Sequence, residues 1–398
     1  MKKKILFIGA YGIENAGDDL PMLVMMDNLK ELSPKSKFEF HALSRHPNKW
    51  EEKNYNIIQH QNLEYANREE AMGKWLRGLN FDDDRGLFND FLELIKSMDI
   101  LIIGAGNFII DISIDVFKGP IPLIWWYIHI AKLYNKKVLL YGFSTALLSS
   151  EYGRLLTKEI MNKSDIVTVR DKDSKKYLKS IGIEKTIQVL PDPTLGVKIK
   201  NQKFSFLNKD DKYILEKHSD LKIALGLRDL SFLKDKGKTV FKEIISFINK
   251  NPKYKYIFIP QSTYFEDDDI KLANELSKMI RKDIDIHIIK NRYNPKDLIK
   301  IYSLCDVTIA IRLHSAVFSQ IATTPAIAIS YLPKVKSYMK DFGTLNQVID
   351  IDKITAQKIR NKLDNIRKNK SLKTTIKEIN IKKNKEVEKY AKLVLSLL

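Results

Sequence analysis

The chain has 398 residues. A single hydrophobic core rarely organises a chain of this length, so we expect two domains. Hydrophobic residues make up 44% and aromatic residues 10%, values of an ordinary globular protein that exclude collagen-like and low-complexity classes. The 68 Lys and Arg residues against 49 Asp and Glu residues give a net charge of +19, which favours anionic partners such as phosphorylated substrates, membrane lipids or nucleic acid.

The N-terminal segment and the cysteine content indicate the compartment. Met1 to Ile8 combines lysines with a short apolar run, and because no convincing cleavage site follows, we expect a buried first strand rather than a signal peptide. No run of about 18 apolar residues predicts a transmembrane helix. The one cysteine, Cys305, excludes an intrachain disulfide framework, and we expect it to be a buried, unreactive thiol. A cytoplasmic location fits these features.

Apolar runs of strand length alternate with amphipathic helical patterns through residues 1–197, which we predict to form an N-terminal domain. Strands that are apolar on both faces and alternate with helices indicate a parallel sheet covered by helices. Residues 50–86 interrupt the pattern and predict a loop or helical insertion. The predicted strands are Lys4–Ile8, Phe38–Leu43, Ile100–Ile103, Lys137–Gly142 and Ile166–Val169, and the predicted helices are Asp18–Leu32, Phe88–Ser97, Ile124–Leu133, Tyr152–Asn162 and Asp173–Ile181.

The alternation restarts after Gly196. Residues 198–220 are polar and irregular and predict an inter-domain segment, and residues 221–350 predict a second α/β domain. The expected fold class is therefore α/β, with two doubly wound parallel-sheet domains that face a central cleft, resembling the GT-B architecture. The predicted strands are Lys222–Leu227, Tyr256–Pro260, Ile284–Ile289, Val307–Ile311 and Ala326–Tyr331, and the predicted helices are Lys238–Asn249, Asp268–Arg281, Pro295–Ser303 and Ser315–Ala322.

The C-terminal residues 351–398 predict basic helices, which we expect to cross back to the first domain. Between Lys353 and Lys385 there are twelve Lys and Arg residues against two acids. A solvated amphipathic helix accounts for this composition, and peripheral docking on the anionic inner face of a membrane is the alternative. Nucleic acid is not expected as a partner, because no recognised binding motif accompanies the charge.

A glycine-rich segment, Gly9 to Asp19, follows the first strand and opens the first helix. A helix N-terminus favours anions, and glycine lets the backbone approach a ligand closely. The spacing is not G-x-G-x-x-G, so the usual dinucleotide fingerprint is absent. Asp18 and Asp19 are alternatively N-cap residues of the helix. The candidate ligand-binding residues are Gly12, Asn15, Gly17 and Asp18.

A second glycine pair, Gly104 and Gly106, follows a very apolar strand and precedes Asn107. Ligands of open α/β sheets gather outside the carboxyl ends of the strands. We therefore predict that Gly104, Gly106 and Asn107 contact substrate. A tight turn without ligand contact is the alternative.

The third motif ends the apolar run that starts at Val307. If the strand extends through Leu313, Arg312 and His314 project from the same face and meet the helix that starts near Ser315. A guanidinium and an imidazole at a helix N-terminus form a site for phosphate or carboxylate, and histidine exchanges protons near neutral pH. Arg228 ends the first strand of the second domain, so we expect it to reach the same cleft.

Two further segments carry charged residues with a structural alternative. Arg170 ends a strand and is expected to pair with a neighbouring carboxylate. Asp192 lies between two prolines and is predicted as either a turn-former or a cleft carboxylate. The seven histidines lack metal-ligand spacing, so no metal site is expected, and no nucleophile elbow is present.

Taken together, these segments resemble the polysaccharide pyruvyl transferase family. The family opening G-x-Y-G-x-x-N-x-G-D is matched by Gly9 to Asp18, V-R-D-x-x-S by Val169 to Ser174, and D-P by Asp192 and Pro193. The R-L-H segment at Arg312 to His314 is followed by I-S-Y-x-P-K-V at Ile329 to Val335. The matches keep the family's order from residue 5 to about residue 343. One departure is Ala105, which stands in the family's usual triple glycine and is expected to reshape the acceptor side.

The resemblance implies transfer of pyruvate from phosphoenolpyruvate, the donor substrate, to two sugar hydroxyls as a ketal, in cell-surface polysaccharide biosynthesis and without a cofactor. It implies donor binding and catalysis by Arg312 and His314 and donor binding by Arg228. The acceptor, a sugar or glycan precursor, is then expected at the first domain. The alternatives are a GT-B glycosyltransferase, a sugar-nucleotide epimerase, and a non-catalytic protein that binds a glycan precursor.

Overall fold

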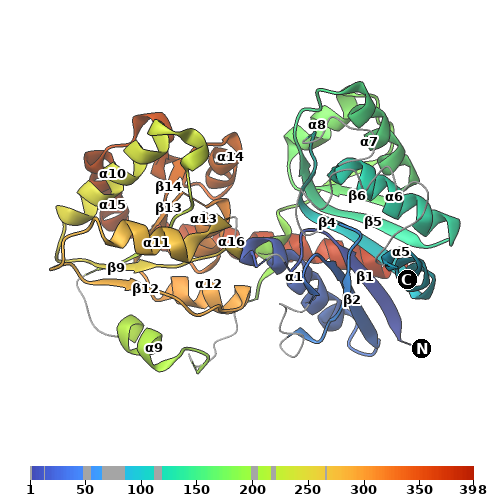
Figure 1. The fold of residues 1–398 in the computed structure, drawn as a ribbon, viewed down its shortest axis with the longest axis horizontal. Coiled ribbons are helices and arrows are strands. Elements are labelled where there is room, and N and C mark those ends of the chain that lie inside the picture. Colours follow the sequence, from blue (N-terminus) through green and yellow to red (C-terminus); the bar gives the residue numbers. More distant parts are fainter. Residues whose placement is uncertain are drawn as a thin grey trace. The chain divides into compact units, whose positions relative to one another are not determined.

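The chain folds as two compact units (Figure 1). The computed structural model describes residues 2–12, 14–47, 55–64, 86–111, 119–198, 205–216, 221–264 and 267–398. Unit 1 comprises Met1–Ile13, Asp18–Gly196 and Lys385–Leu398, and unit 2 comprises Glu14–Gly17 and Val197–Asn384. Neither unit is therefore a single continuous stretch of sequence.

Unit 1 is built on a seven-stranded parallel sheet with the strand order β3-β2-β1-β4-β5-β6-β7. The order reverses between β1 and β4, which is the topological switch of a doubly wound sheet. The strands are β1 (Lys3–Ile8), β2 (Phe38–Ser44), β3 (Ile58–Gln61), β4 (Ile100–Ile109), β5 (Lys137–Thr145), β6 (Ile166–Val169) and β7 (Ile187–Val189).

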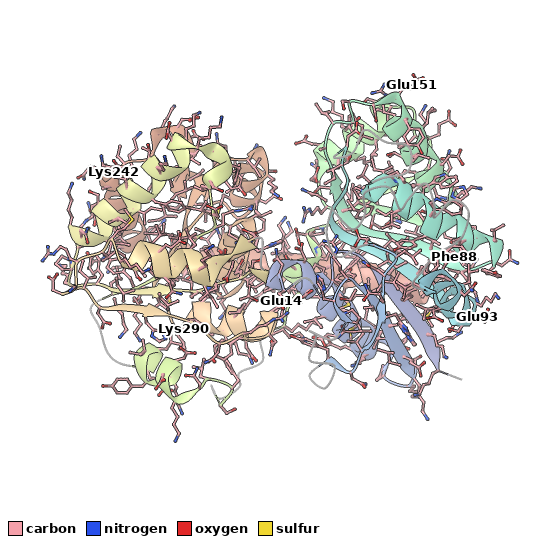
Figure 2. All side chains as sticks on the ribbon, in the orientation of Figure 1. Glu14, Phe88, Glu93, Glu151, Lys242 and Lys290 are labelled. Atoms are coloured by element: carbon pink, nitrogen blue, oxygen red, sulfur yellow. The ribbon has the colours of Figure 1, made fainter. Side chains whose placement is uncertain are left out.

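Helices cover both faces of this sheet. On one face, apolar residues of four helices join those of the strands in one core cluster. On the other face lies α1 (Ala16–Leu32), where the Tyr141 hydroxyl of β5 donates to the Pro21 carbonyl at 2.9 Å. Charged residues such as Glu93 lie on the exposed sides of the helices (Figure 2). The four helices are α5 (Leu87–Ser97), α6 (Pro120–Leu133), α7 (Glu151–Lys163) and α8 (Lys172–Ser180).

Strand β4 runs through the glycine pair to Ile109, so the prediction that this strand ends before Gly104 is wrong. Gly104 and Gly106 have φ angles of 132° and 116°, which suit glycine, and both still pair with β5. A Cβ atom at Gly104 would lie 2.2 Å from the carbonyl oxygen of Tyr141. The glycines therefore let β4 follow its neighbour closely.

Unit 2 is built on a six-stranded parallel sheet with the order β12-β9-β8-β13-β14-β15, so the predicted pair of doubly wound parallel sheets is confirmed. The strands are β8 (Lys222–Gly226), β9 (Lys255–Phe258), β12 (Ile286–Ile288), β13 (Val307–Ala310), β14 (Ala326–Ser330) and β15 (Val348–Asp350). The helices are α9 (Lys209–Glu216), α10 (Asp235–Asn249), α11 (Asp269–Ser277), α12 (Pro295–Ser303), α13 (Leu313–Ile321), α14 (Pro333–Asp341) and α15 (Ala356–Lys368). A short antiparallel hairpin, β10 (Thr263–Tyr264) with β11 (Asp267–Asp268), precedes α11.

Two irregular segments in the prediction contain regular structure. Within residues 198–220, helix α9 forms because Leu215 is buried and the Asp211 carboxylate accepts a hydrogen bond from the Tyr293 hydroxyl at 2.6 Å. Within residues 50–86, β3 pairs in parallel with β2, so a loop or helical insertion is wrong for residues 58–61. Residues 50–54 and 65–85 of that predicted insertion lie outside the described residues.

Helix α16 (Leu372–Leu395) contributes to both units. In unit 2, the side-chain amides of Asn380 and Asn384 donate to the carbonyls of Gln320 at 2.6 Å and Val197 at 3.1 Å. In unit 1, the Tyr390 hydroxyl donates to the Pro191 carbonyl at 3.0 Å. In the part of the chain that the structure describes, no helix is long and apolar enough to span a bilayer.

Candidate functional site

Arg312 starts helix α13 instead of ending strand β13. The strand stops at Ala310, and the Arg312 carbonyl accepts hydrogen bonds from the N–H groups of Ser315 at 2.6 Å and Ala316 at 3.3 Å. The prediction that Arg312 and His314 project from one face of an extended strand is therefore wrong. Residues two apart at a helix start point to different sides, because a helix has 3.6 residues per turn.

Two carboxylates hold the Arg312 side chain, which is 6% exposed. Its Nη2 lies 2.6 Å from Asp267 Oδ2 and 2.9 Å from Asp269 Oδ1. Burial alone would lower the pKa of this guanidinium, but the charge of Asp269 and the hydrogen bond with Asp267 raise the pKa above its ordinary value. Arg312 is thus a permanent buried cation.

Arg228 reaches the same carboxylate from the end of β8. Its Nη2 lies 3.5 Å from Asp267 Oδ2, and its Nη1 donates to the Tyr331 hydroxyl at 2.9 Å. The Arg228 guanidinium carbon lies 5.7 Å and 5.9 Å from the ring centroids of Phe232 and Tyr331, within cation–π distance. Two guanidiniums, one just after β8 and the other at the start of α13, therefore meet at one carboxylate oxygen.

Asp269 is anchored by the backbone as well as by Arg312. Its Oδ2 accepts hydrogen bonds from the N–H groups of Gln261 at 2.9 Å and Ser262 at 3.0 Å. Burial raises its pKa to about 6, although Arg312 and the two N–H donors act in the opposite direction. Asp269 is consequently ionised near neutral pH and protonated in mild acid.

We expect this carboxyl group to make stability fall as the pH rises from about 4 to about 6. In that range the folded protein holds a proton on Asp269 that the unfolded chain has released, since the pKa rises from 3.8 to about 6 on folding. Two pKa units correspond to a loss on the order of 3 kcal/mol in the free energy of unfolding. Urea unfolding of the wild type and of Asp269→Asn across this pH range measures the free energy of unfolding of each protein. If the difference between the two free energies stays constant with pH, the expectation is contradicted.

His314 lies against the backbone of Gly17, and both residues belong to unit 2. A Cβ atom at position 17 would lie 1.9 Å from the His314 Nδ1 atom. The segment 14–17 is held by the stretch that precedes α11: the Ala16 N–H donates to the Gln261 carbonyl at 2.9 Å, and the Thr263 N–H donates to the Glu14 carbonyl at 3.1 Å. The glycine-rich segment and the Arg312–His314 segment are therefore in contact. Among the amino acids, only glycine at position 17 leaves room for the His314 imidazole.

The side chain of Glu14, labelled in Figure 2, adds to this attachment. Its carboxylate accepts from the Thr263 hydroxyl at 3.0 Å and lies 3.4 Å from Arg292 Nη1. The segment that carries Gly17 is therefore attached to unit 2 through both backbone and side chain.

The family resemblance implies that His314 takes part in the transfer reaction. On that basis Gly17→Ala, whose methyl group would displace His314, is expected to lower the turnover of this reaction about tenfold or more, because a misplacement of about 1 Å can cost about 10²-fold. Turnover of the Gly17→Ala, His314→Ala and double variants measures this effect. If the methyl group acts through His314, it adds little on the His314→Ala background. Fully additive losses would assign the effect to another group.

The other polar groups at the start of α1 bond within the glycine-rich segment. The Gly12 N–H donates to Asp19 Oδ1 at 3.1 Å, and the Gly17 N–H donates to Asn15 Oδ1 at 3.1 Å. Asn15 therefore accepts a hydrogen bond from the first turn of α1, as an N-cap side chain does. Asp18 is half-buried in that turn.

A separate polar network surrounds Asn107 in unit 1. Arg170 donates to the Asn107 side-chain oxygen at 2.9 Å, to Asp192 Oδ2 at 2.8 Å and to Ser144 Oγ at 2.7 Å. The expected pairing of Arg170 with a carboxylate is confirmed. Asp192 also accepts from the Thr194 N–H at 3.0 Å, which gives it the turn-forming role.

The predicted site residues fall into both units. Ser315 is fully buried, and its hydroxyl packs against Gly226 of β8. Cys305 is buried as predicted, and burial raises its pKa to about 12. The described residues contain no cluster of His, Cys, Asp or Glu that could hold a metal ion. Gly12, Asp18, Gly104, Gly106 and Asn107 belong to unit 1, and Asn15, Gly17, Arg228, Arg312, His314 and Ser315 to unit 2.

Sequence reasoning missed four residues of the arginine site, namely Asp267, Asp269, Phe232 and Tyr331. The run Glu266 to Asp269 after the apolar strand β9 was the available signal for the two carboxylates, since it follows the carboxyl edge of a parallel sheet. No sequence pattern of this kind predicts that Phe232 belongs to the arginine site.

Solved structures with the same fold include glycosyltransferases of the GT-B type and epimerases. A UDP-GlcNAc 2-epimerase from Neisseria meningitidis, bound to UDP-GlcNAc, matches with a TM-score of 0.60 and 12% identity, over 100% of this chain and 99% of that one. HepE from Anabaena, in complex with UDP and glucose, matches with a TM-score of 0.56 and 9% identity, over 100% of both chains. These likenesses define a GT-B-like α/β protein.

Sequence comparison assigns the family within this class. Residues 15–333 match the family described as polysaccharide pyruvyl transferase. This chain therefore belongs to the polysaccharide pyruvyl transferase family, as the motifs predict. The amylovoran biosynthesis protein AmsJ of Erwinia amylovora is 23% identical over 278 residues, which cover 66% of this chain and 64% of that protein. The match thus spans slightly less than two thirds of the relative's length.

Proposed function

We propose that this protein transfers pyruvate from phosphoenolpyruvate to two hydroxyls of a sugar acceptor, forming a cyclic ketal for an extracellular polysaccharide. The observation that carries the proposal is the meeting of Arg228 and Arg312 at Asp267, where α13 with His314 begins. Phosphoenolpyruvate has a carboxylate and a phosphate, and arginine binds both groups through paired N–H donors. Family membership supports a transferase.

The reaction needs one proton donor and two anion anchors. Arg228 and Arg312 hold the carboxylate and phosphate, and His314 donates a proton to the methylene carbon, which becomes the ketal methyl group. A sugar hydroxyl attacks the oxocarbenium-like carbon and loses its proton. The carbon–oxygen bond to phosphate then breaks, phosphate leaves, and a second hydroxyl closes the ring and releases its proton. His314 regains a proton during these steps, so it acts as both acid and base.

The acceptor is proposed to bind unit 1 near Gly12, Asp18, Gly106 and Asn107. Gly106 has an open space where a Cβ atom would stand, and the Asn107 side chain is exposed. Neutral hydroxyls suit such backbone and amide groups, whereas the cationic anchors of unit 2 suit the donor. No cofactor or metal is required by this chemistry, and the reaction is proposed to take place in the cytoplasm.

Phosphate release from phosphoenolpyruvate in the presence of nucleotide- and lipid-linked sugars tests the proposal. We expect acceptor-dependent phosphate release and a product with the added mass of one pyruvyl ketal. A GT-B glycosyltransferase would instead release a nucleotide, and an epimerase would change the sugar without phosphate release. A non-catalytic glycan-binding protein would bind the sugar and release neither product.

A lipid-linked acceptor is compatible with the basic surface of the C-terminal helices. Lys358, Arg367, Lys373, Lys377 and Lys382 are exposed on α15 and α16. Such side chains are attracted to anionic lipids at about 1 kcal/mol each at low salt. We propose peripheral binding to an anionic membrane face. We expect the protein to sediment with phosphatidylglycerol vesicles in a salt-sensitive manner. It is not expected to sediment with phosphatidylcholine vesicles.

A further inference from the structure

The two carboxylates that hold Arg312 are not equivalent. Asp269 is 4% exposed, and two backbone N–H groups fix its second oxygen. The Asp267 side chain is 26% exposed, and its Oδ2 is shared between Arg312 and Arg228. Asp269 is therefore a built-in part of the arginine site, whereas Asp267 enters that site from a partly solvated position.

The arginine pair has hydrogen-bonding capacity that Asp267 does not use. Among the described residues, the buried Nε atoms of Arg228 and Arg312 have no hydrogen-bond partner. A guanidinium binds a carboxylate or phosphate best through two parallel N–H donors. The Asp267 Oδ2 atom instead lies near one Nη2 atom of each guanidinium. A ligand with more anionic oxygens would satisfy both arginines better.

The local charge balance gives Asp267 a role when no substrate is bound. Arg228 and Arg312 carry two positive charges, which Asp267 and Asp269 neutralise. Without Asp267 the site has one uncompensated positive charge, and the two cations repel each other. Asp267 lies in the hairpin β10–β11 with its side chain 26% exposed, whereas Asp269 is buried and is fixed by two backbone N–H groups, so moving the Asp267 carboxylate costs less than moving that of Asp269.

From this geometry we propose that Asp267 is an internal substitute for the donor's anionic group: it pairs with the two arginines in the unliganded protein, and the donor displaces it on binding. Asp269 is a positioning residue that keeps Arg312 in place. This inference rests on the proposed binding of phosphoenolpyruvate at the two arginines. It assigns opposite effects to two neighbouring carboxylates: Asp267 competes with the donor, and Asp269 supports the binding of the donor.

Conservative amide variants separate the two roles. Asp267→Asn keeps the shape of the side chain but removes the competing charge, so the dissociation constant of the donor is expected to fall about three- to tenfold, the size of a partly exposed ion pair. Asp269→Asn removes the buried partner of Arg312, so the same constant is expected to rise about tenfold or more. The matched control is Asp268→Asn in the same hairpin. The Asp268 carboxylate accepts from the Ile270 and Lys271 N–H groups at the start of α11, a role that asparagine fills equally well.

Calorimetric titration of the whole protein with phosphoenolpyruvate and with inorganic phosphate, near neutral pH, tests the inference. The expected order of affinity for both ligands is Asp267→Asn, then the wild type together with Asp268→Asn, then Asp269→Asn. Binding by Asp267→Asn that is equal to or weaker than that of Asp268→Asn would overturn the inference. So would the absence of binding to all the variants.

A second variant and a second readout keep the result interpretable. If Asp267→Asn does not fold, Asp267→Ser removes the same charge with a shorter side chain and must also bind both anions more tightly. Turnover with a sugar acceptor is measured separately. Normal turnover with no gain in affinity rejects the role of Asp267 and leaves pyruvyl transfer intact. The expected affinity order without ketal formation rejects pyruvyl transfer and leaves an anion site with an internal substitute.

Discussion

His314→Ala is expected to lower the turnover number for phosphate release from phosphoenolpyruvate by about 10²–10⁴-fold, the usual contribution of a positioned acid or base. The protein should remain folded, because the His314 side chain is only half-buried. Steady-state kinetics and thermal unfolding of the same preparation measure both quantities.

A second histidine provides the control for this variant. His129 on α6 is also half-buried, and its Nδ1 lies 2.8 Å from the Trp125 carbonyl. His129→Ala should leave turnover within about twofold of the wild type, since surface substitutions away from a site change little. Turnover of His314→Ala close to that of His129→Ala would remove His314 from the mechanism.

Arg312→Met is expected to abolish measurable donor binding and to lower the free energy of unfolding by about 3–5 kcal/mol. The stability loss arises because Asp269, at 4% exposure, would be left without its buried counterion. Urea unfolding near neutral pH and calorimetric titration with phosphoenolpyruvate measure the two effects.

Arg228→Met separates binding from stability. The Arg228 side chain is 29% exposed and its ion pair with Asp267 is longer, so its loss should cost only about 0–1 kcal/mol of stability. Donor affinity should still fall, because one of the two anchors is missing. If Arg312→Met were as stable as Arg228→Met, the buried ion pairs of Arg312 would not be a structural support.

Much of the fold could be predicted because buried parallel strands are apolar on both faces. Runs such as Ile100–Ile103 and Val307–Ile311 are therefore visible without any structure. The ends of these strands were less predictable. β13 stops at Ala310 because the Arg312 carbonyl begins α13, and β4 continues because glycines at 104 and 106 adopt positive φ angles. Both outcomes depend on contacts with neighbouring elements, which local patterns do not encode.

The candidate site could be predicted only in part for a similar reason. Arg228, Arg312 and His314 stand out because each follows an apolar strand. Asp267 and Asp269 become partners of Arg312 only through the hairpin after β9, and Gly17 reaches His314 only because residues 14–17 pair with a segment about 250 residues away in the chain. No spacing rule links positions so far apart.

The division of the chain into interlaced units has a consequence for biosynthesis. The sheet of unit 1 is complete once β7 has left the ribosome, but Val387, Tyr390 and Val394, which are buried in that unit, are translated about 200 residues later. Domains generally fold as units during synthesis, N-terminal first. The apolar surface of unit 1 that α16 covers therefore stays uncovered, and accessible to chaperones, until the whole of unit 2 has been translated.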